Sequence, residues 1–206
     1  MVNEYNAFIK PRFLEVFCGT MKSGKTKRLV ERVDPIRWIQ NAEFIFIKPR
    51  MDNRSDNTRK DPLTYADWNF VNEKDPVEIL NIVKPEHKVV AIDELQFFSE
   101  AIISVIESLL KQGKNVLVAG LDLDFKGEPF GPVPRILCMA DIVYKQPAVC
   151  EYPGCGMPAT RIQRLIDGKP AHYTSPLIII EGTQKNVEYF SYCLKHHVVP
   201  GKPGLD

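Results

Sequence analysis

Residues 19–26 read Gly19-Thr20-Met21-Lys22-Ser23-Gly24-Lys25-Thr26, which fits the pattern G-x-x-x-x-G-K-[ST] at every fixed position. The preceding run, 13–18, is rich in strand-forming residues, and apolar residues at helical spacing follow the loop. In this setting the glycines let successive backbone N–H groups curl around a phosphate chain at the N-terminus of the helix. The order strand, loop, helix therefore predicts a nucleotide site, with Lys25 on the β- and γ-phosphates and Thr26 on Mg²⁺.

The composition is ordinary for a globular protein. The chain has 206 residues, of which 44% are hydrophobic and 26% charged, and its formal net charge is +1. That length predicts one large domain, or a main domain with a small appendage. Balanced charge without a basic stripe argues against a dedicated nucleic-acid binder. We find no secretion signal and no membrane-spanning apolar run, and so expect a cytoplasmic protein without a membrane partner.

Strands and helices alternate after the phosphate loop. Helical spacing of apolar residues predicts a helix over 99–110. Alternation of this kind favours an α/β fold, here a P-loop (RecA-like) parallel sheet flanked by helices. Continuous apolar runs predict the buried strands, at 43–47, 88–92 and 115–120.

Prolines indicate where helices end. A helix should run from Thr26 towards Trp38, and Pro35 should distort it or end it early. The stretch 129–134 holds three prolines and reads as irregular. Shortly after it, Cys138 has apolar neighbours and is interpreted as a core residue.

Two adjacent carboxylates, Asp93 and Glu94, end the apolar run at 88–92. Such a pair is typical of a Walker B strand. Asp93 is then the partner of the Mg²⁺ held by Thr26, which leaves Glu94 to orient or deprotonate a nucleophile. Acidic residues at this position could instead cap the following helix.

The last third of the chain has the spacing of a metal site. Cys150 and Cys155 form a C-x₄-C pair, and Cys193 and His196 form a C-x₂-H pair about forty residues later. Three thiolates and an imidazole suit a structural zinc ion, since four protein ligands leave no open position. His197 is the rival fourth ligand on spacing alone.

The chain thus divides into three segments. Residues 1–12 read as a flexible lead-in, 13–146 as the P-loop α/β domain and 147–206 as a zinc-binding lasso or lid domain. Within the last segment, 177–180 reads as a strand followed by a loop. A zinc-pinned lid could exclude water from phosphoryl transfer.

With these motifs in hand, the sequence resembles the cytosolic, zinc-containing thymidine kinase family from about Phe13 onward. Several motifs in the right order make the resemblance specific. They are Gly19 to Thr26, Lys48-Pro49 with Asp52 and Arg54, Asp93 to Phe98, Gly120 to Phe125 with Pro129-Phe130-Gly131, Cys150/Cys155 with Ala159 to Leu165, and Cys193/His196.

The resemblance implies ATP-dependent phosphorylation of the thymidine 5′-hydroxyl, with deoxyuridine as a weaker substrate. It also implies a homotetramer that uses Mg²⁺ and structural Zn²⁺ and is inhibited by thymidine triphosphate. By motif position, Glu94 looks like the general base, and Arg54 and Arg164 like partners of the transferring phosphate. The residues implied to contact the nucleoside are Met21, Asp52, Phe97, Leu121, Phe125, Ile162, Ile178, Ile179, Ile180, Glu181, Gly182 and Tyr189.

The sequence departs from the family pattern at three positions: Lys22 stands where the family usually has an apolar residue, Ile162 replaces the usual threonine, and Glu181 lies in a segment that is normally rich in glycine. Ile162 could still pack on the thymine methyl group. Two other functions fit parts of the sequence. One is a P-loop ATPase in which the carboxylate pair activates water, and the other is a zinc module that binds nucleic acid.

Overall fold

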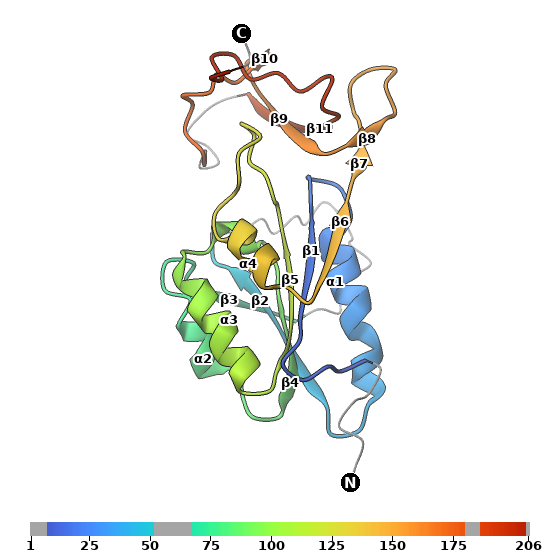
Figure 1. The fold of residues 1–206 in the computed structure, drawn as a ribbon, viewed down its shortest axis with the longest axis vertical. Helices are drawn as coiled ribbons and strands as arrows, with labels where there is room; N and C mark the ends of the chain where they lie inside the picture. The colour runs from blue at the N-terminus through green and yellow to red at the C-terminus, as the bar shows by residue number, and fades with distance from the viewer. Residues whose placement is uncertain (1–7, 52–66, 180–185, 205–206) are drawn as a thin grey trace. The chain divides into compact units, whose positions relative to one another are not determined.

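The computed structural model describes residues 8–51, 67–179 and 186–204. Its largest element is a six-stranded sheet with the order β3-β2-β4-β5-β1-β6, in which the β3–β2, β2–β4, β4–β5 and β5–β1 pairs are parallel (Figure 1). The predicted parallel α/β sheet is thus confirmed. The strands are β1 (Leu14–Gly19), β2 (Glu43–Pro49), β3 (Trp68–Val71), β4 (His87–Ile92), β5 (Asn115–Gly120) and β6 (Ile142–Gln146).

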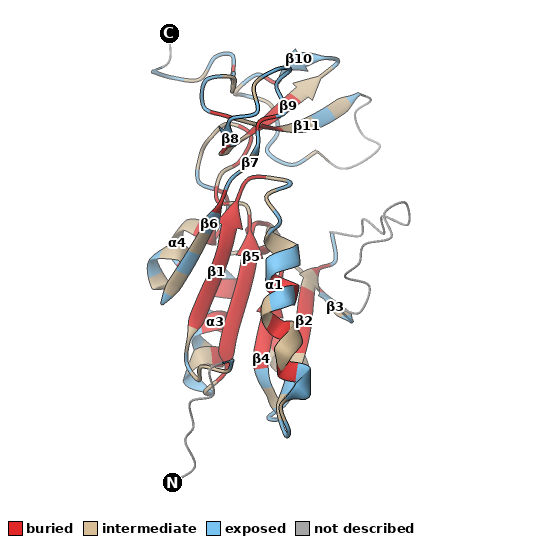
Figure 2. Ribbon diagram, turned by 90° about the vertical axis from the view of Figure 1, so that its right-hand side faces the viewer, coloured by how far each residue is buried: buried red, intermediate tan, exposed pale blue. Residues whose placement is uncertain are grey.

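Helices cover both faces of this sheet. Because side chains alternate along a strand, Val90 and Ile92 of β4 join one core, while Val89 and Ala91 join the other. Strands β1 and β5 are buried along their full length, as Figure 2 shows. The helix on one face is α1 (Lys25–Val33), and those on the other are α2 (Glu78–Ile82), α3 (Ala101–Lys111) and α4 (Val133–Met139).

Several expected boundaries differ from the observed ones. Helix α1 ends at Val33, and the turn containing Pro35 continues as a 3-10 helix over Asp34–Trp38, as the proline predicts. The irregular stretch is shorter than expected, because Pro134 fits in the first turn of α4, where its missing N–H costs no hydrogen bond. Cys138 is exposed, so the core interpretation is wrong: α4 buries Val133 and Ile136 instead.

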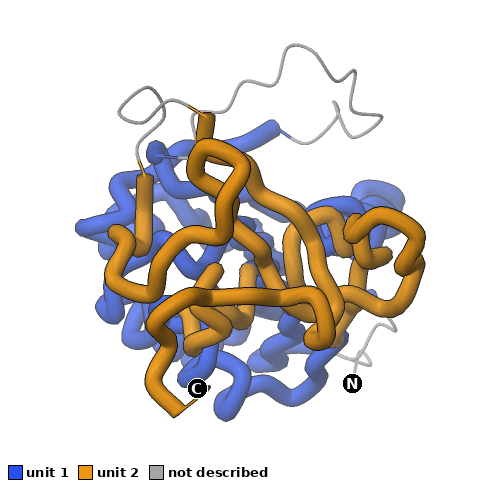
Figure 3. Tube along the Cα trace, turned by 90° about the horizontal axis from the view of Figure 1, so that it is seen from above, with its two compact units in different colours: residues 1–18, 25–120, 131–144 blue, residues 19–24, 121–130, 145–206 orange. Residues whose placement is uncertain are grey.

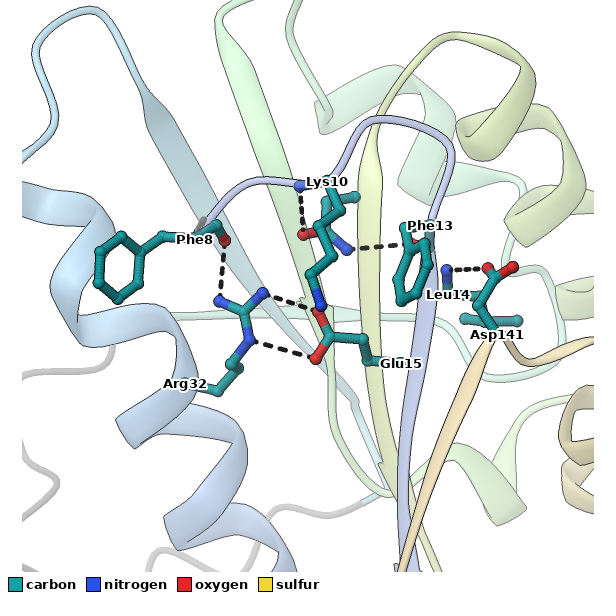
Figure 4. A network of polar contacts seen from close by, with 8 residues as sticks. Phe8, Lys10, Phe13, Leu14, Glu15, Arg32 and Asp141 are labelled. Carbon is teal, nitrogen blue, oxygen red and sulfur yellow. Dashed lines mark hydrogen bonds and ion pairs between the residues drawn. The ribbon is translucent and has the colours of Figure 1, made fainter. Parts of the chain in front are cut away.

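Part of the N-terminal lead-in is hydrogen-bonded to the sheet. The backbone N–H of Lys10 donates to Asn115, and that of Arg12 donates to the Lys114 carbonyl. Figure 4 shows the centre of this network. There Arg32 of α1 forms an ion pair with the wholly buried carboxylate of Glu15 and also donates a 2.8 Å hydrogen bond to the Phe8 carbonyl. These contacts fix helix α1 against strand β1.

The chain forms two compact units (Figure 3). Unit 1 comprises residues 1–18, 25–120 and 131–144, and unit 2 comprises 19–24, 121–130 and 145–206. In the described part of the chain, no helix combines the length and apolar character that a membrane span requires.

Unit 2 contains two small antiparallel sheets. The predicted strand at 177–180 is wrong for its described residues, since 177–179 form none. The carbonyls of Pro176 and Leu177 accept hydrogen bonds from the Arg164 side chain instead of from a neighbouring strand. One sheet has the order β10-β9-β11, with β9 (Arg161–Ile166), β10 (Lys169–Pro170) and β11 (Val187–Tyr192), and the other pairs β7 (Ala148–Val149) with β8 (Pro158–Ala159).

Candidate active site and metal centre

The phosphate loop has a backbone suited to binding an anion. Gly19 and Gly24 adopt φ values of +136° and +82°, which side chains strongly disfavour. A Cβ on Gly19 would also collide with the Gln146 carbonyl oxygen. Ser23 Oγ is buried without a hydrogen-bond partner among the described residues, so a hydrogen-bonding group remains for a ligand. The loop then enters helix α1 at Lys25.

The first turn of α1 is joined to the end of β4. Thr26 Oγ1 donates a 2.8 Å hydrogen bond to Asp93 Oδ2, and Asp93 is only 1% exposed. Lys48 Nζ lies 3.5 Å from the same oxygen and 4.4 Å from the centre of the Trp68 ring. A hydroxyl and a carboxylate this close offer the oxygen ligands that Mg²⁺ prefers.

Glu94 occupies an unusual backbone conformation directly after Asp93. Its φ and ψ are 53° and 40°, the left-handed region that non-glycine residues rarely adopt. The Gln96 side-chain amide, itself buried, donates a 2.5 Å hydrogen bond to Glu94 Oε2. The backbone N–H of Glu94 donates to Asp93 Oδ1 at 2.9 Å. Glu94 is therefore oriented by its own backbone and by Gln96, and its role as general base stays a prediction.

An apolar cluster in unit 2 brings together several residues expected to contact a nucleoside. Phe125 and Ile162 are each 3% exposed, and partly buried side chains pack against them. The members of this cluster from the expected set are Met21, Leu121, Phe125, Ile162 and Tyr189.

Arg164 is buried in the same unit. Its guanidinium carbon lies 3.6 Å from the centre of the Phe125 ring, and its two terminal nitrogens donate to the carbonyls of Pro176 and Leu177. Burial lowers the pKa of this guanidinium. These contacts hold the chain at 176–177, and the expected contact of Arg164 with a transferring phosphate stays a prediction.

Four metal-ligating side chains converge in unit 2, as the spacing predicted. The ligand atoms of Cys150, Cys155, Cys193 and His196 all lie within 4.8 Å of one another. Cys155 Sγ is 3.8 Å from Cys193 Sγ, and His196 Nδ1 is 3.4 Å from Cys193 Sγ. Sulfur ligands arranged tetrahedrally on Zn–S bonds of about 2.3 Å are about 3.8 Å apart, so the cluster fits zinc.

The surroundings favour a thiolate and select His196. Burial raises the pKa of Cys150, but hydrogen bonds from the Cys193 N–H and from His196 outweigh it and lower the pKa to about 6. The His196 ring stacks on Tyr152 with centroids 4.0 Å apart. His197 instead pairs with the Phe125 carbonyl through Nε2, at 2.9 Å, so the rival ligand does not join the cluster.

The remaining residues that we expected to contact the nucleoside do not belong to the apolar cluster around Phe125. Phe97 is partly buried and belongs to unit 1. Ile178 is exposed and Ile179 partly buried. The other expected contacts lie outside the described residues: Asp52, Arg54, Ile180, Glu181 and Gly182.

Sequence reasoning gave no role to three polar residues beside the predicted ones. Lys48 could have been found from its position at the end of β2, because β2 adjoins the strand that carries Asp93. Gln96 follows Glu94 by two residues, but only the left-handed turn brings them together. Glu151, next to Cys150, contacts Lys22 of the phosphate loop, and no pattern in the sequence indicates that contact.

Comparison with known proteins identifies the family of this chain. The family model described as thymidine kinase matches residues 12–197. A thymidine kinase of Coprothermobacter proteolyticus is 45% identical over 190 residues, which are 92% of this chain and 92% of that protein. Among solved structures, domain III of the Thermotoga maritima replication initiation protein DnaA aligns with a TM-score of 0.40 and 13% identity, over 65% of this chain and 55% of that chain. On the extent and identity of the first two matches, the chain belongs to the thymidine kinase family.

Proposed function

We propose that this chain transfers the γ-phosphate of ATP to the 5′-hydroxyl of thymidine, giving thymidine monophosphate and ADP. Family membership supports the substrate and the reaction. The observation that carries the chemistry is the end of β4, where Asp93 is bonded to Thr26 while Glu94 is held separately by Gln96. Two adjacent carboxylates thus have different partners, which suits them to different tasks.

In the proposed reaction, the phosphate loop and Lys25 bind the β- and γ-phosphates of ATP. Glu94 accepts the proton of the 5′-hydroxyl as the O5′–P bond forms, and the bond from the γ-phosphorus to the β,γ-bridging oxygen breaks to release ADP. Arg54 and Arg164 are proposed to meet the charge on the transferring phosphate. Arg164 already belongs to the unit that holds the apolar cluster.

Two metal ions complete the proposal. Thr26 and Asp93 would hold Mg²⁺, which supplies positive charge to the phosphates when bound. Cys150, Cys155, Cys193 and His196 would hold a structural Zn²⁺ that fixes the fold around them.

The apolar cluster around Phe125 suits a flat base with a methyl group. Ile162 replaces the usual threonine, and its burial in this cluster supports an apolar contact with the methyl group of thymine. We therefore propose thymidine as the preferred acceptor and deoxyuridine, which lacks the methyl group, as a weaker one. A methyl group in an apolar pocket contributes roughly 1–3 kcal/mol, or about tenfold or more in kcat/KM.

The family resemblance also extends the proposal to assembly and control. We propose a cytoplasmic homotetramer that thymidine triphosphate inhibits by feedback. Light scattering of the purified chain and inhibition by thymidine triphosphate at fixed thymidine test these two statements separately.

A panel of nucleosides tests reaction and selectivity together. Each nucleoside is incubated with γ-labelled ATP and Mg²⁺, and the labelled product is identified by chromatography. The proposal expects label in thymidine 5′-monophosphate first and deoxyuridine monophosphate second. Label transferred equally to purine and pyrimidine nucleosides, or to none, would contradict it.

A further inference from the structure

The phosphate loop is attached to the C-terminal part of unit 2 through polar contacts. Thr20 Oγ1 donates to the Arg161 carbonyl oxygen at 3.0 Å, and Ser191 Oγ donates to the Met21 carbonyl oxygen at 2.6 Å. Lys22 Nζ lies 2.5 Å from Glu151 Oε1. Three consecutive loop residues are thus held by β9, by β11 and by the turn that follows Cys150.

Glu151 connects two of these contacts. While one carboxylate oxygen takes the Lys22 ammonium, the other accepts the backbone N–H of Ser191 at 2.7 Å. The backbone N–H of Glu151 in turn donates to the Ser191 carbonyl oxygen at 2.9 Å. Ser191 is fully buried. Lys22, Glu151 and Ser191 therefore act as a single connected group, which we call the loop clamp.

The loop clamp is continuous with the metal centre. Glu151 follows Cys150 directly, and Ser191 lies two residues before Cys193. The Cys193 backbone N–H donates to Cys150 Sγ at 3.2 Å, so the two segments that carry the clamp are the two that carry metal ligands. Fixing those ligands fixes Glu151 and Ser191, and through them the loop.

Lys22 adopts a conformation that needs external support. Its φ is 59°, in the left-handed region, although it is not a glycine. Such a backbone persists when surrounding contacts hold it. The ion pair with Glu151 is one such contact, and it directs the Lys22 ammonium to a carboxylate.

From these contacts we propose that Glu151 is a positioning residue, which couples the occupancy of the metal centre to the nucleotide-binding conformation of the phosphate loop. The inference rests on the proposed function, since it takes ATP as the ligand of the loop and zinc as the metal. By linkage, nucleotide and zinc then strengthen each other's binding. The chemistry of the phosphoryl transfer itself is unchanged by the clamp.

The direction in which Glu151→Gln changes ADP affinity distinguishes the loop clamp from a purely electrostatic effect. Glu151→Gln removes a negative charge in contact with the phosphate loop, which by Coulomb's law alone should favour an anionic ligand. The clamp predicts the reverse, because the loop spends less time in its binding conformation. For a pair whose side chains are 45% and 31% exposed, the expected loss of ADP affinity is about two- to fivefold.

Equilibrium binding of ADP with Mg²⁺, measured by titration calorimetry on the zinc-loaded full chain, is the test. Lys22→Met and Glu151→Gln should each weaken binding about two- to fivefold, and the double variant should be no weaker than either single one. Lys169→Met is the matched control. It removes an exposed lysine of unit 2 that has no ion pair among the described residues, and it should bind ADP as the wild type does.

A second test measures zinc affinity and does not depend on enzyme activity. Zinc affinity is measured by competition with a chromophoric chelator, with and without saturating ADP. ADP should raise zinc affinity in the wild type by about the same two- to fivefold, and should leave it unchanged in Glu151→Gln. Zinc content and circular dichroism of each variant verify the fold before either measurement.

The outcomes separate the two proposals. If Glu151→Gln binds ADP as tightly as the wild type or more tightly while Lys22→Met binds it weakly, Lys22 contacts phosphate directly and the clamp is refuted. An ADP-independent zinc affinity in the wild type also refutes it. A wild-type chain that binds no ADP at all overturns the proposed function, and the clamp with it.

Discussion

Arg32 neutralises the Glu15 carboxylate, which is wholly buried in strand β1. Removing the Arg32 guanidinium should therefore lower the free energy of unfolding considerably. The Glu15 side chain is 0% exposed, and Arg32 meets it with N–O distances of 2.7 and 3.2 Å. Arg32→Met keeps most of the aliphatic stem but leaves this carboxylate without a partner cation in the core. Breaking one side of a buried ion pair costs about 3–5 kcal/mol. For a chain of this size, that lowers the thermal midpoint by roughly 6–20 °C.

The two tryptophans make the assay specific for the unit that contains the ion pair. Trp38 and Trp68 both belong to unit 1, and Trp68 packs on Phe46 with ring centroids 5.1 Å apart. Urea unfolding followed by tryptophan fluorescence therefore reports on this unit. Lys27→Met is the control on the same helix. It breaks an exposed pair with Glu31 and should change the free energy of unfolding by no more than about 0.5 kcal/mol.

A double variant tests the reason for the loss. In Glu15→Gln/Arg32→Met the buried charge is gone, so this chain should be more stable than Arg32→Met alone. A free energy of unfolding for Arg32→Met within about 1 kcal/mol of the wild-type value, the typical effect of an ordinary substitution, would contradict a stabilising role for this buried ion pair. A double variant that is no more stable than Arg32→Met would contradict the cost assigned to the unpaired Glu15 charge.

Three further substitutions test the site. Glu94→Gln should lower kcat by about 100-fold or more while ADP still binds, because only the proton acceptor is lost; near-wild-type turnover would remove Glu94 as the base. Gln96→Leu should lower kcat about tenfold with KM unchanged, since Glu94 loses the hydrogen bond that orients it; an unchanged kcat would contradict that role. Cys193→Ser should lose stoichiometric zinc, and wild-type zinc affinity should fall steadily as the pH is lowered, because protons compete with zinc for the cysteine thiolates and the pKa of Cys155 is raised. A Cys193→Ser variant that keeps one zinc per chain would refute the ligand set.

The sequence was most informative where a local pattern has a single structural meaning. Continuous apolar runs predicted strands β2, β4 and β5, because a strand buried on both faces has no polar side. The spacing of the cysteines and His196 predicted that Cys150, Cys155, Cys193 and His196 converge, because side chains that share one metal ion have to meet at one point.

Residues whose role depends on contacts between distant segments were missed. Strands β9 and β11 mix polar with apolar residues, and their pairing joins segments more than twenty residues apart. The apolar run at 177–179 looked like a strand, but these residues form none, and the Leu177 carbonyl accepts a hydrogen bond from the Arg164 side chain instead. The choice between His196 and His197 depended on the Phe125 carbonyl, which spacing cannot reveal.

The most direct test of the account is whether ATP cleavage requires a nucleoside. ADP release by the zinc-loaded chain with ATP and Mg²⁺ is measured with and without thymidine. We expect negligible release without thymidine, and one thymidine 5′-monophosphate formed per ADP released when thymidine is present. Release at the full rate without any nucleoside would show that Glu94 activates water, and the chain would be an ATPase.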